Sequence, residues 1–234
     1  GWNAKDESMN PTDMEGRDGI SSWAWDIDAL VGGLGDSYKI MECGMKAFPT
    51  EALTHTHLSC LLNAMIGNNL EYSDIKEVKV TCFAQAYDIL FDPTKYRPES
   101  RETADHSLPY CMAAAMVDKK ITTESFSDEK LNDPRIYEVI DKIKGEPSQE
   151  FEKMFPAKQP SRVVVTTNDG RTFEEYLEYP KGDPREPMTM DDLENKFNSL
   201  VGDKFDDSKK NKIKDTIFDC EELTAGEFMQ SLNV

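Results

Sequence analysis

RVVVTTNDGRTFEEYLEY, residues 162–179, is the stretch that decides the fold. Two runs typical of strands, Arg162 to Thr167 and Arg171 to Tyr179, flank Asn168-Asp169-Gly170, a turn sequence suited to left-handed backbone. These residues predict a β-hairpin. Upstream, Val78, Val80 and Cys82 alternate with polar residues, which predicts a further half-buried strand over residues 78–83.

Helical patterns surround these strands. Apolar residues recur at three- and four-residue spacing at Leu58, Leu61, Leu62 and Met65. This spacing predicts an amphipathic helix that ends at residues 67–69. Other helices are predicted over residues 20–34, 109–117, 134–143, 190–201 and 209–218, and a short strand over residues 38–43. Thr224 and Glu227 form a capping box for a last helical turn.

The order of these elements predicts an α+β fold. Residues 36–185 form a small mixed-layer domain with the β-hairpin and packed helices, and residues 186–234 form a helical C-terminal segment. Residues 1–35 contribute a polar lead-in followed by the first helix.

Composition excludes several classes of function. The chain has 234 residues, and 45 acidic against 27 basic residues give a net charge of -18, which repels nucleic acids and acidic membrane surfaces. No apolar run approaches the roughly 18–20 residues of a membrane helix. Five cysteines without a CxxC pair and no secretory signal indicate free thiols in the cytoplasm. Because no initiating Met is present, we expect a processed product or a piece of a longer protein.

All three histidines lie in two short segments. In a helix, His55 and His57 are about 200° apart, so the pair cannot serve one metal ion. His55 lies near the edge of the apolar face, where a structural role is favoured, and His57 is expected further toward solvent. Glu51 either stabilises the helix start or faces a cleft, and the first interpretation is favoured. Lys46 is either a solvated charge or a ligand for a carboxylate.

The second segment is RETADHSLPY, residues 101–110. Arg101 supplies a guanidinium, and Asp105 places a carboxylate beside the imidazole of His106. Ser107 can cap the helix that follows. This set can bind an anion and transfer protons, although a capped helix with a surface arginine explains it equally well. Because the sequence has no P-loop, GxGxxG, GxSxG or zinc pattern, acid–base chemistry on a small anion without a cofactor or metal remains open.

Taken in order, these segments resemble the carboxy-terminal half of the MmgE/PrpD family, which includes 2-methylcitrate dehydratases and cis-aconitate decarboxylases. The resemblance rests on MKAFP at 45–49, on DIKEVKV at 74–80 leading to Tyr87, on the run from Asp92 to Tyr110, on the hairpin and on EPM at 186–188. It covers residues 19–230.

The resemblance implies a cofactor-free enzyme in which a helical domain and an α+β lid enclose the active site. It places the lid at residues 36–185 and returns residues 1–35 and 186–234 to the helical domain. Lys46, Tyr87 and His106 are then expected as catalytic residues on one wall of the site. Arg101, His55 and Ser107 are expected to bind substrate.

The family pattern also includes an amino-terminal helical half, which this sequence lacks. We therefore expect that half, as a subunit or as the rest of the protein, to complete the site within an oligomer. The expected reaction is the hydro-lyase dehydration of a tricarboxylate such as 2-methylcitrate, as in propionate metabolism. The alternative is a non-catalytic lid or regulatory subunit that binds the helical partner.

Overall fold

The computed structural model describes residues 32–232, which belong to two compact units, residues 1–43 and 44–234. In the first unit the strand predicted over residues 38–43 is wrong. Lys39–Glu42 forms a 3-10 helix, because the amides of Met41 and Cys43 bond to carbonyls three residues earlier instead of to another strand. The helix predicted over residues 20–34 lies outside the described residues up to residue 31.

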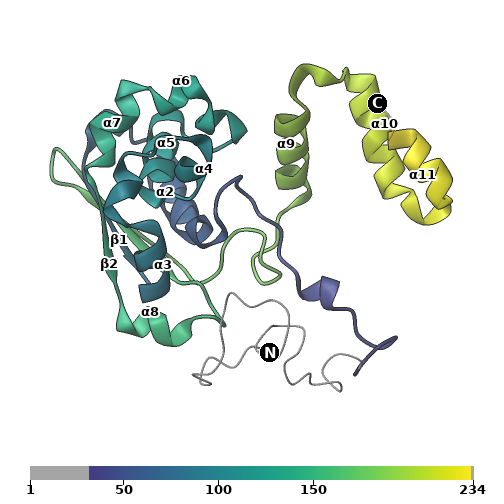
Figure 1. The fold of residues 1–234 in the computed structure, drawn as a ribbon, viewed down its shortest axis with the longest axis horizontal. Helices are drawn as coiled ribbons and strands as arrows, with labels where there is room; N and C mark the ends of the chain where they lie inside the picture. The colour runs from purple at the N-terminus through teal and green to yellow at the C-terminus, as the bar shows by residue number, and fades with distance from the viewer. Residues whose placement is uncertain (1–31, 233–234) are drawn as a thin grey trace, which may run out of the picture. The chain divides into compact units, whose positions relative to one another are not determined.

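The second unit is built on a mixed four-stranded sheet in the order β2-β1-β3-β4 (Figure 1). The strands are β1 (Ile75–Cys82), β2 (Ile143–Pro147), β3 (Ser161–Thr167) and β4 (Thr172–Leu177). β1 runs parallel to β2 and antiparallel to β3. β3 and β4 pair antiparallel as the predicted hairpin, which is confirmed.

Strand β2 corrects the prediction of one helix over residues 134–143. Helix α7 (Pro134–Ile140) ends early, and Ile143 begins a strand that pairs with Val78. Gly145 lies in β2 where the Phe91 side chain packs against its backbone, since an added Cβ would lie 2.6 Å from that ring. This close approach explains why a glycine stands in a strand.

Helices cover one face of the sheet. α2 (His55–Gly67) contacts β3, β4 and α5 (Leu108–Asp118), and α5 also contacts α7 and β2. α5 is buried from Leu108 to Met116, as expected for a helix that is apolar on nearly all sides. The other short helices of this region are α3 (Ala84–Leu90), α4 (Arg101–Asp105), α6 (Asp128–Leu131) and α8 (Gln149–Met154).

The opposite face of the sheet is charged. Lys79 pairs with Glu146 across β1 and β2 at 2.8 Å, and Arg162 pairs with Glu174 across β3 and β4 at 3.2 Å. The inner positions are buried, as Val78, Val80 and Val163 show. A sheet with one apolar and one polar face confirms the α+β class.

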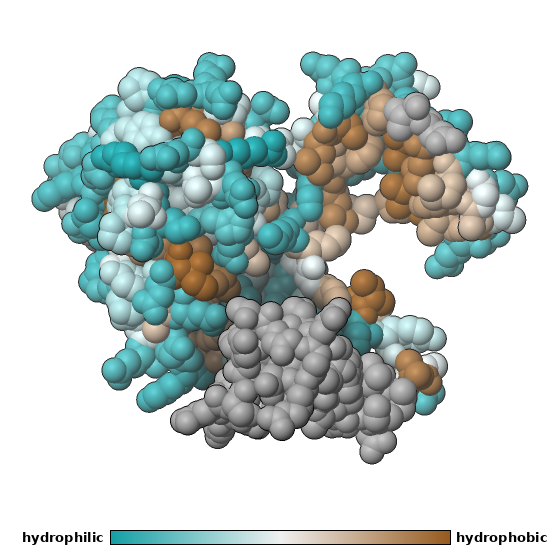
Figure 2. All heavy atoms as spheres, in the orientation of Figure 1, coloured by the Kyte–Doolittle hydropathy of each residue, from teal (hydrophilic) through white to brown (hydrophobic). Residues whose placement is uncertain are grey.

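The C-terminal segment is helical: α9 (Met190–Val201), α10 (Asp207–Phe218) and α11 (Ala225–Leu232). Thr189 with Asp192 and Thr224 with Glu227 form capping boxes at α9 and α11. Figure 2 shows apolar surface on these helices, where Leu200, Phe218 and Met229 are more than half exposed. The three-part division at residues 35 and 185 stays a prediction.

Short 3-10 helices connect several elements. In the second unit they span Ala52–Thr54, Tyr72–Asp74, Pro93–Tyr96, Thr123–Phe126, Gly202–Lys204 and Cys220–Glu222. The segments that enter and leave the α+β layer are paired, because Met45 N donates to Gly182 O at 2.8 Å. Gly182 has a φ of 94° and a Cβ there would lie 1.9 Å from Met45 O, so this crossing requires glycine.

Candidate functional site

Two of the predicted site residues line one cavity. Lys46 and His106 are brought together because Glu51 N donates to Asp105 O at 3.0 Å, which ties the segment before α2 to the end of α4. The cavity between them, called the His106 cavity below, has a volume of about 330 Å³. Its lining consists of Lys46, Pro49, Thr50, Glu51, Ala52, Asp105 and His106.

Lys46 is exposed, and its Nζ donates to Thr50 O at 2.9 Å. The Thr50 and Thr54 hydroxyls lie 2.7 Å apart, and this buried contact fixes the loop that accepts the lysine. No carboxylate within residues 32–232 pairs with Lys46. Two of the three N–H groups of its ammonium therefore remain for another acceptor.

His106 is exposed at the end of α4. Its Nδ1 bonds to the Asp105 carboxylate and lies 3.1 Å from the carbonyl of Glu102. Because both partners are acceptors, Nδ1 carries a proton, and Nε2 is left without either of these partners. An imidazole held in this way can accept a proton at Nε2 and return it.

Glu51 both stabilises a helix start and faces a cavity, the two roles considered for it from the sequence. Its carboxylate accepts from Leu53 N at 2.7 Å at the start of the 3-10 helix that precedes α2. The same residue lines the His106 cavity. A carboxylate at a helix start is stabilised by the free backbone amides there, and here it also borders the imidazole and the lysine.

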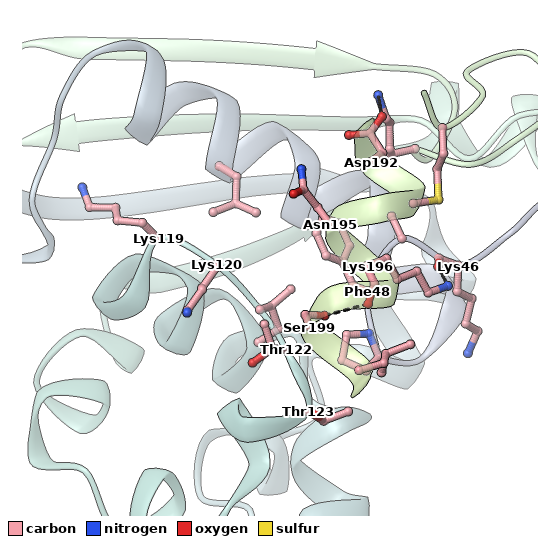
Figure 3. A pocket seen from close by; sticks show the side chains of 17 residues that line it. Lys46, Phe48, Lys119, Lys120, Thr122, Thr123, Asp192, Asn195, Lys196 and Ser199 are labelled. Atoms are coloured by element: carbon pink, nitrogen blue, oxygen red, sulfur yellow. Dashed lines mark hydrogen bonds and ion pairs between the residues drawn. The ribbon is translucent and has the colours of Figure 1, made fainter. Parts of the chain in front are cut away.

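A larger cavity is also lined in part by the Lys46 segment (Figure 3). It has a volume of about 530 Å³ and five lysines line it, so we call it the lysine cavity. One face of α9 closes it, through Asp192, Asn195, Lys196, Ser199 and Leu200. The remaining lining residues are Lys46, Ala47, Phe48, Pro49, Leu62, Lys119, Lys120, Ile121, Thr122, Thr123, Lys181 and Met188.

The two histidines of α2 are buried. His55 packs against Phe48, with ring centroids 5.4 Å apart, and is 2% exposed. Burial lowers the pKa of His55 to about 4, a hydrogen bond to the Thr50 backbone acts in the opposite direction, and the charges of Lys46 and Lys196 lower the pKa further. His55 lines neither cavity, and its Nε2 is buried without a hydrogen-bond partner within the described chain.

The expectation that His57 faces solvent is wrong. His57 is fully buried against β3, where its Nδ1 lies 2.6 Å from the Ser161 hydroxyl, and burial lowers its pKa to about 3. Strand β3 therefore covers this side of α2. His55 and His57 do lie in a helix, as predicted. No local pattern in the sequence shows that the side of this helix that carries His57 is also buried.

The other predicted residues lie elsewhere. Tyr87, on α3, stacks on Phe91 with centroids 5.7 Å apart and lines neither cavity. Arg101 begins α4, exposed, with no hydrogen bond or ion pair to residues 32–232. Ser107 is buried, donates to Lys95 O at 2.5 Å and accepts from Tyr110 N at 3.0 Å, so its hydroxyl caps α5. Roles for these side chains in substrate binding or catalysis stay predictions.

Lys120 and Lys196 are cavity residues that the sequence did not point to. Lys196 Nζ donates to Lys46 O at 2.7 Å, across 150 residues of sequence. Lys120 follows Lys119, which ends α5 with a φ of 56°. Charged residues after a helix are usually solvated, so only the fold places them at a cavity.

The cysteines do not contribute nucleophiles to either cavity. All five are free thiols, and Cys60, Cys82 and Cys111 are buried. Burial raises the pKa of Cys60 and of Cys82 to about 12, so both remain protonated and unreactive near neutral pH. Within residues 32–232, no helix is long and apolar enough to cross a membrane.

Comparison with known proteins shows which family this chain resembles. The family model described as the MmgE/PrpD C-terminal domain matches residues 48–221. A cis-aconitate decarboxylase of Aspergillus terreus is 25% identical over 204 residues, which are 84% of this chain and 41% of that protein. The chain thus spans about two fifths of that relative.

Mammalian relatives match over a shorter region. A cis-aconitate decarboxylase of Mus musculus is 33% identical over 100 residues, 43% of this chain and 20% of that protein. A protein of the same name in Homo sapiens is 32% identical over 100 residues, 43% of this chain and 21% of that protein.

Proposed function

Because the chain belongs to the MmgE/PrpD family, we propose that it supplies one wall of the active site of a lyase that acts on a small tricarboxylate. The observation that carries the proposal is the His106 cavity, where Lys46 and the Asp105–His106 pair come together. An unpaired ammonium suits a substrate carboxylate, and an oriented imidazole suits proton transfer at carbon.

Decarboxylation is the reaction we favour, because the relatives from Aspergillus terreus, mouse and human are named cis-aconitate decarboxylases. When a carboxylate leaves as CO2, the electron pair of the broken C–C bond stays on the carbon skeleton and a proton must be added there. His106, once protonated at Nε2, can deliver that proton. Lys46 would meanwhile hold a carboxylate that remains.

Dehydration of 2-methylcitrate is the second candidate, and the tautomer of His106 favours it. With its Nδ1 proton directed to Asp105, the ring leaves Nε2 as the atom that could remove a proton from carbon. An acid must then protonate the departing hydroxyl, a role predicted for Tyr87 from the family resemblance, although Tyr87 lines neither cavity in this structure. The two reactions share the lysine and the histidine and differ in the bond that breaks.

We further propose that an amino-terminal helical portion of the protein, or a partner subunit, forms the opposite wall. Three observations support this: the chain spans 41% of a relative, Lys46 and His106 are exposed, and the C-terminal helices expose apolar side chains. Leu200, Ile217, Phe218 and Met229 are each about half exposed or more, which suits packing against further helices.

Binding of an anionic substrate to this acidic chain requires positive charges close to the binding site. A chain with a net charge of -18 repels a trianion at long range, and salt screens this repulsion beyond roughly 8–10 Å. Near the His106 cavity, Lys46 and Lys196 lie close enough to lower the pKa of His55 through their charge. These two lysines would supply the attraction, against the Glu51 and Asp105 carboxylates that also line the cavity.

The test is turnover followed by NMR. Cis-aconitate and 2-methylcitrate are each incubated with the chain alone and with its full-length protein or copurifying partner, and products are identified by proton NMR. CO2 release from cis-aconitate supports the favoured reaction, and an alkene from 2-methylcitrate supports the second. Turnover of neither substrate by the complete protein leaves the non-catalytic lid as the function.

Variants then test the residues. Lys46→Ala and His106→Gln should each lower kcat/KM by about 10²–10⁴-fold, the usual size of acid–base and charge-stabilising contributions. Tyr87→Phe should lower it for the dehydration reaction. Lys204→Ala, in the exposed Gly202–Lys204 turn, is the matched control. Unchanged rates in Lys46→Ala and His106→Gln would contradict the assignment.

A further inference from the structure

We propose that Thr54 is a positioning residue of the site described above. Its buried hydroxyl fixes the peptide unit that joins Thr50 to Glu51. This peptide unit in turn holds Lys46 and His106 in their relative places. The inference rests on the proposed function, because it deepens the roles given there to the lysine and the histidine. Thr54 lines neither cavity, so it acts through these residues and not on the substrate.

One peptide unit connects Lys46 to the Asp105–His106 pair. The carbonyl of Thr50 accepts the Lys46 ammonium at 2.9 Å. The amide of Glu51 donates to the carbonyl of Asp105 at 3.0 Å, directly before His106 in the chain. Because this carbonyl and this amide belong to one trans peptide, they point in opposite directions from a single rigid plane. The orientation of that plane therefore sets where the lysine lies relative to the imidazole.

The Thr54 hydroxyl bonds to the residues on both sides of this peptide unit. It donates to the carbonyl of Glu51 at 2.7 Å. A hydroxyl has one proton, so in the 2.7 Å contact with Thr50 the Thr54 oxygen accepts and the Thr50 hydroxyl donates. Both residues of the peptide unit are thus bonded to one oxygen atom, which restricts rotation about the bonds beside the peptide.

Thr54 is itself held in place by the body of the fold. It is fully buried and directly precedes α2, a helix that contacts β3 and β4 and is buried over most of its length. Its backbone amide also donates to the carbonyl of Glu51, at 3.1 Å. The exposed Lys46 and His106 are therefore attached to a rigid element through one buried hydroxyl.

The role requires a hydroxyl and not only a side chain of this size. Valine has the shape of threonine but no hydroxyl, so Thr54→Val would leave the Thr50 hydroxyl buried without this acceptor. The carbonyl of Glu51 would keep only the backbone amide as a donor from this residue. Serine keeps the hydroxyl and loses one methyl group. The two substitutions therefore separate positioning by hydrogen bonds from the filling of space.

The first test is hydrogen–deuterium exchange of the folded chain, followed by NMR, which needs no substrate. Exchange at the Glu51 amide reports how often its bond to the Asp105 carbonyl opens. In Thr54→Val this exchange should be about tenfold faster, the effect of losing one buried hydrogen bond of typical strength. In Thr54→Ser it should stay within about threefold of the wild-type rate. Unchanged exchange in Thr54→Val, or equally fast exchange in both variants, would overturn the proposal.

A threonine of the C-terminal helices provides the matched control. Thr216 is buried in α10, where its hydroxyl donates to the carbonyl of Lys212 at 2.8 Å, and it lines neither the His106 cavity nor the lysine cavity. Thr216→Val should leave exchange at Glu51 unchanged, and an equal acceleration there would mean general loosening and overturn the proposal. Circular dichroism shows whether each variant folds.

A second variant covers the case in which Thr54→Val does not fold. Thr50→Val removes the donor of the same hydroxyl pair and leaves the Thr54 hydroxyl bonded to Glu51. It should also accelerate exchange at the Glu51 amide, because one of the two bonds that flank the peptide unit is lost. Wild-type exchange in a folded Thr50→Val variant would contradict the proposal in that case.

The second test uses turnover by the complete protein and asks whether Thr54 acts through Lys46. Thr54→Val should lower kcat/KM by about tenfold, and Thr54→Ser should restore most of the loss. In a Lys46→Ala background the valine substitution should have a smaller effect, because the lysine that it misplaces is gone. An equal loss in both backgrounds would overturn the proposal. Absence of turnover in the wild-type protein would end the lyase proposal alone, since exchange at Glu51 still shows whether Thr54 holds the peptide unit.

Discussion

The body of the second unit, residues 44–188, and its tail, residues 189–232, bury their apolar side chains to very different extents. In the body, α2, α5 and the inner face of the sheet share a continuous core in which Leu58, Val80 and Met112 are fully buried. In the tail, Ile213 and Thr216 are the only buried residues among those whose side chains the structure describes. Leu200, Phe218 and Met229 remain more than half exposed.

This difference in burial reflects two sources of structure, local sequence signals in the tail and contacts between distant segments in the body. The tail helices are set by local signals, since Thr189 with Asp192 and Thr224 with Glu227 cap them. The body is set by contacts between distant segments, such as β1 with β3 and α2 with β4. The tail, where few side chains are buried, leaves apolar side chains for another surface, which is the role we propose for it.

Truncating a leucine in the body and one in the tail should give the largest difference in the free energy of unfolding. Leu58→Ala, in α2, should lower the free energy of unfolding by about 2–5 kcal/mol, because it opens a cavity that the sheet and helices cannot fill. Leu200→Ala, at a side chain that is 52% exposed, should change it by no more than about 0.5 kcal/mol. Urea unfolding followed by circular dichroism measures both, and equal effects would contradict the comparison.

A glycine of the body should be the next most sensitive position. Gly145→Ala would place its Cβ 2.6 Å from the Phe91 ring, and overpacking of this kind should cost about 1–3 kcal/mol. The same chemical denaturation measures the loss. Adding Phe91→Leu should recover part of it, since a smaller side chain leaves room for the methyl group. No recovery in the double variant would mean that the strand backbone, and not the ring, resists the change.

Local patterns predicted much of this fold from sequence. The hairpin at 162–179 and the helix containing Leu58 were found because turn chemistry and spacing lie within a few residues. β2 was missed because IKGEP has no alternation and its parallel partner β1 lies more than 60 residues earlier. A strand defined only by its distant neighbour leaves little mark on its own sequence.

The candidate site was predicted less completely for the same reason. Lys46 and His106 were found through residue type and family resemblance, but the cavity joins them through a hydrogen bond from Glu51 N to Asp105 O. Lys196 reaches Lys46 O across 150 residues, which no local pattern records. Tyr87 was expected on the same wall, but it lines neither cavity and stacks on Phe91, its neighbour four residues along at the end of α3.

Mild acid should destabilise the body through its buried histidines. His55 and His57 have folded-state pKa values of about 4 and about 3, below the ordinary value of 6.5. Below pH 6.5 the unfolded chain binds protons that the folded chain excludes, so stability is complete above that pH and declines as the pH falls. Each histidine should contribute about 1.4 kcal/mol per pH unit between roughly pH 6 and 4.5.

Variants separate these contributions by slope. His57→Gln should remove its share of the pH dependence, whatever it does to stability at pH 7, because glutamine does not titrate. Asn211→Gln, at an exposed side chain that does not titrate, should leave the slope unchanged. Urea unfolding at half-unit intervals of pH gives the slopes. An unaltered slope in His57→Gln would show that this histidine does not drive the acid response.

The smallest effect should come from a glycine of the tail. Gly226 lies in the first turn of α11, and an added Cβ would meet no atom within 4 Å. Gly226→Ala should therefore stabilise α11 by about 0.5–1 kcal/mol, because alanine loses less backbone freedom than glycine on entering a helix. Helical ellipticity at 222 nm, followed through thermal unfolding, measures the gain. Where Gly145 in the body has a ring against its backbone, Gly226 has open space, so the same substitution should change stability in opposite directions. A loss at Gly226 would mean that this face of α11 is already covered, and the contrast between a self-covered body and an uncovered tail would fail there.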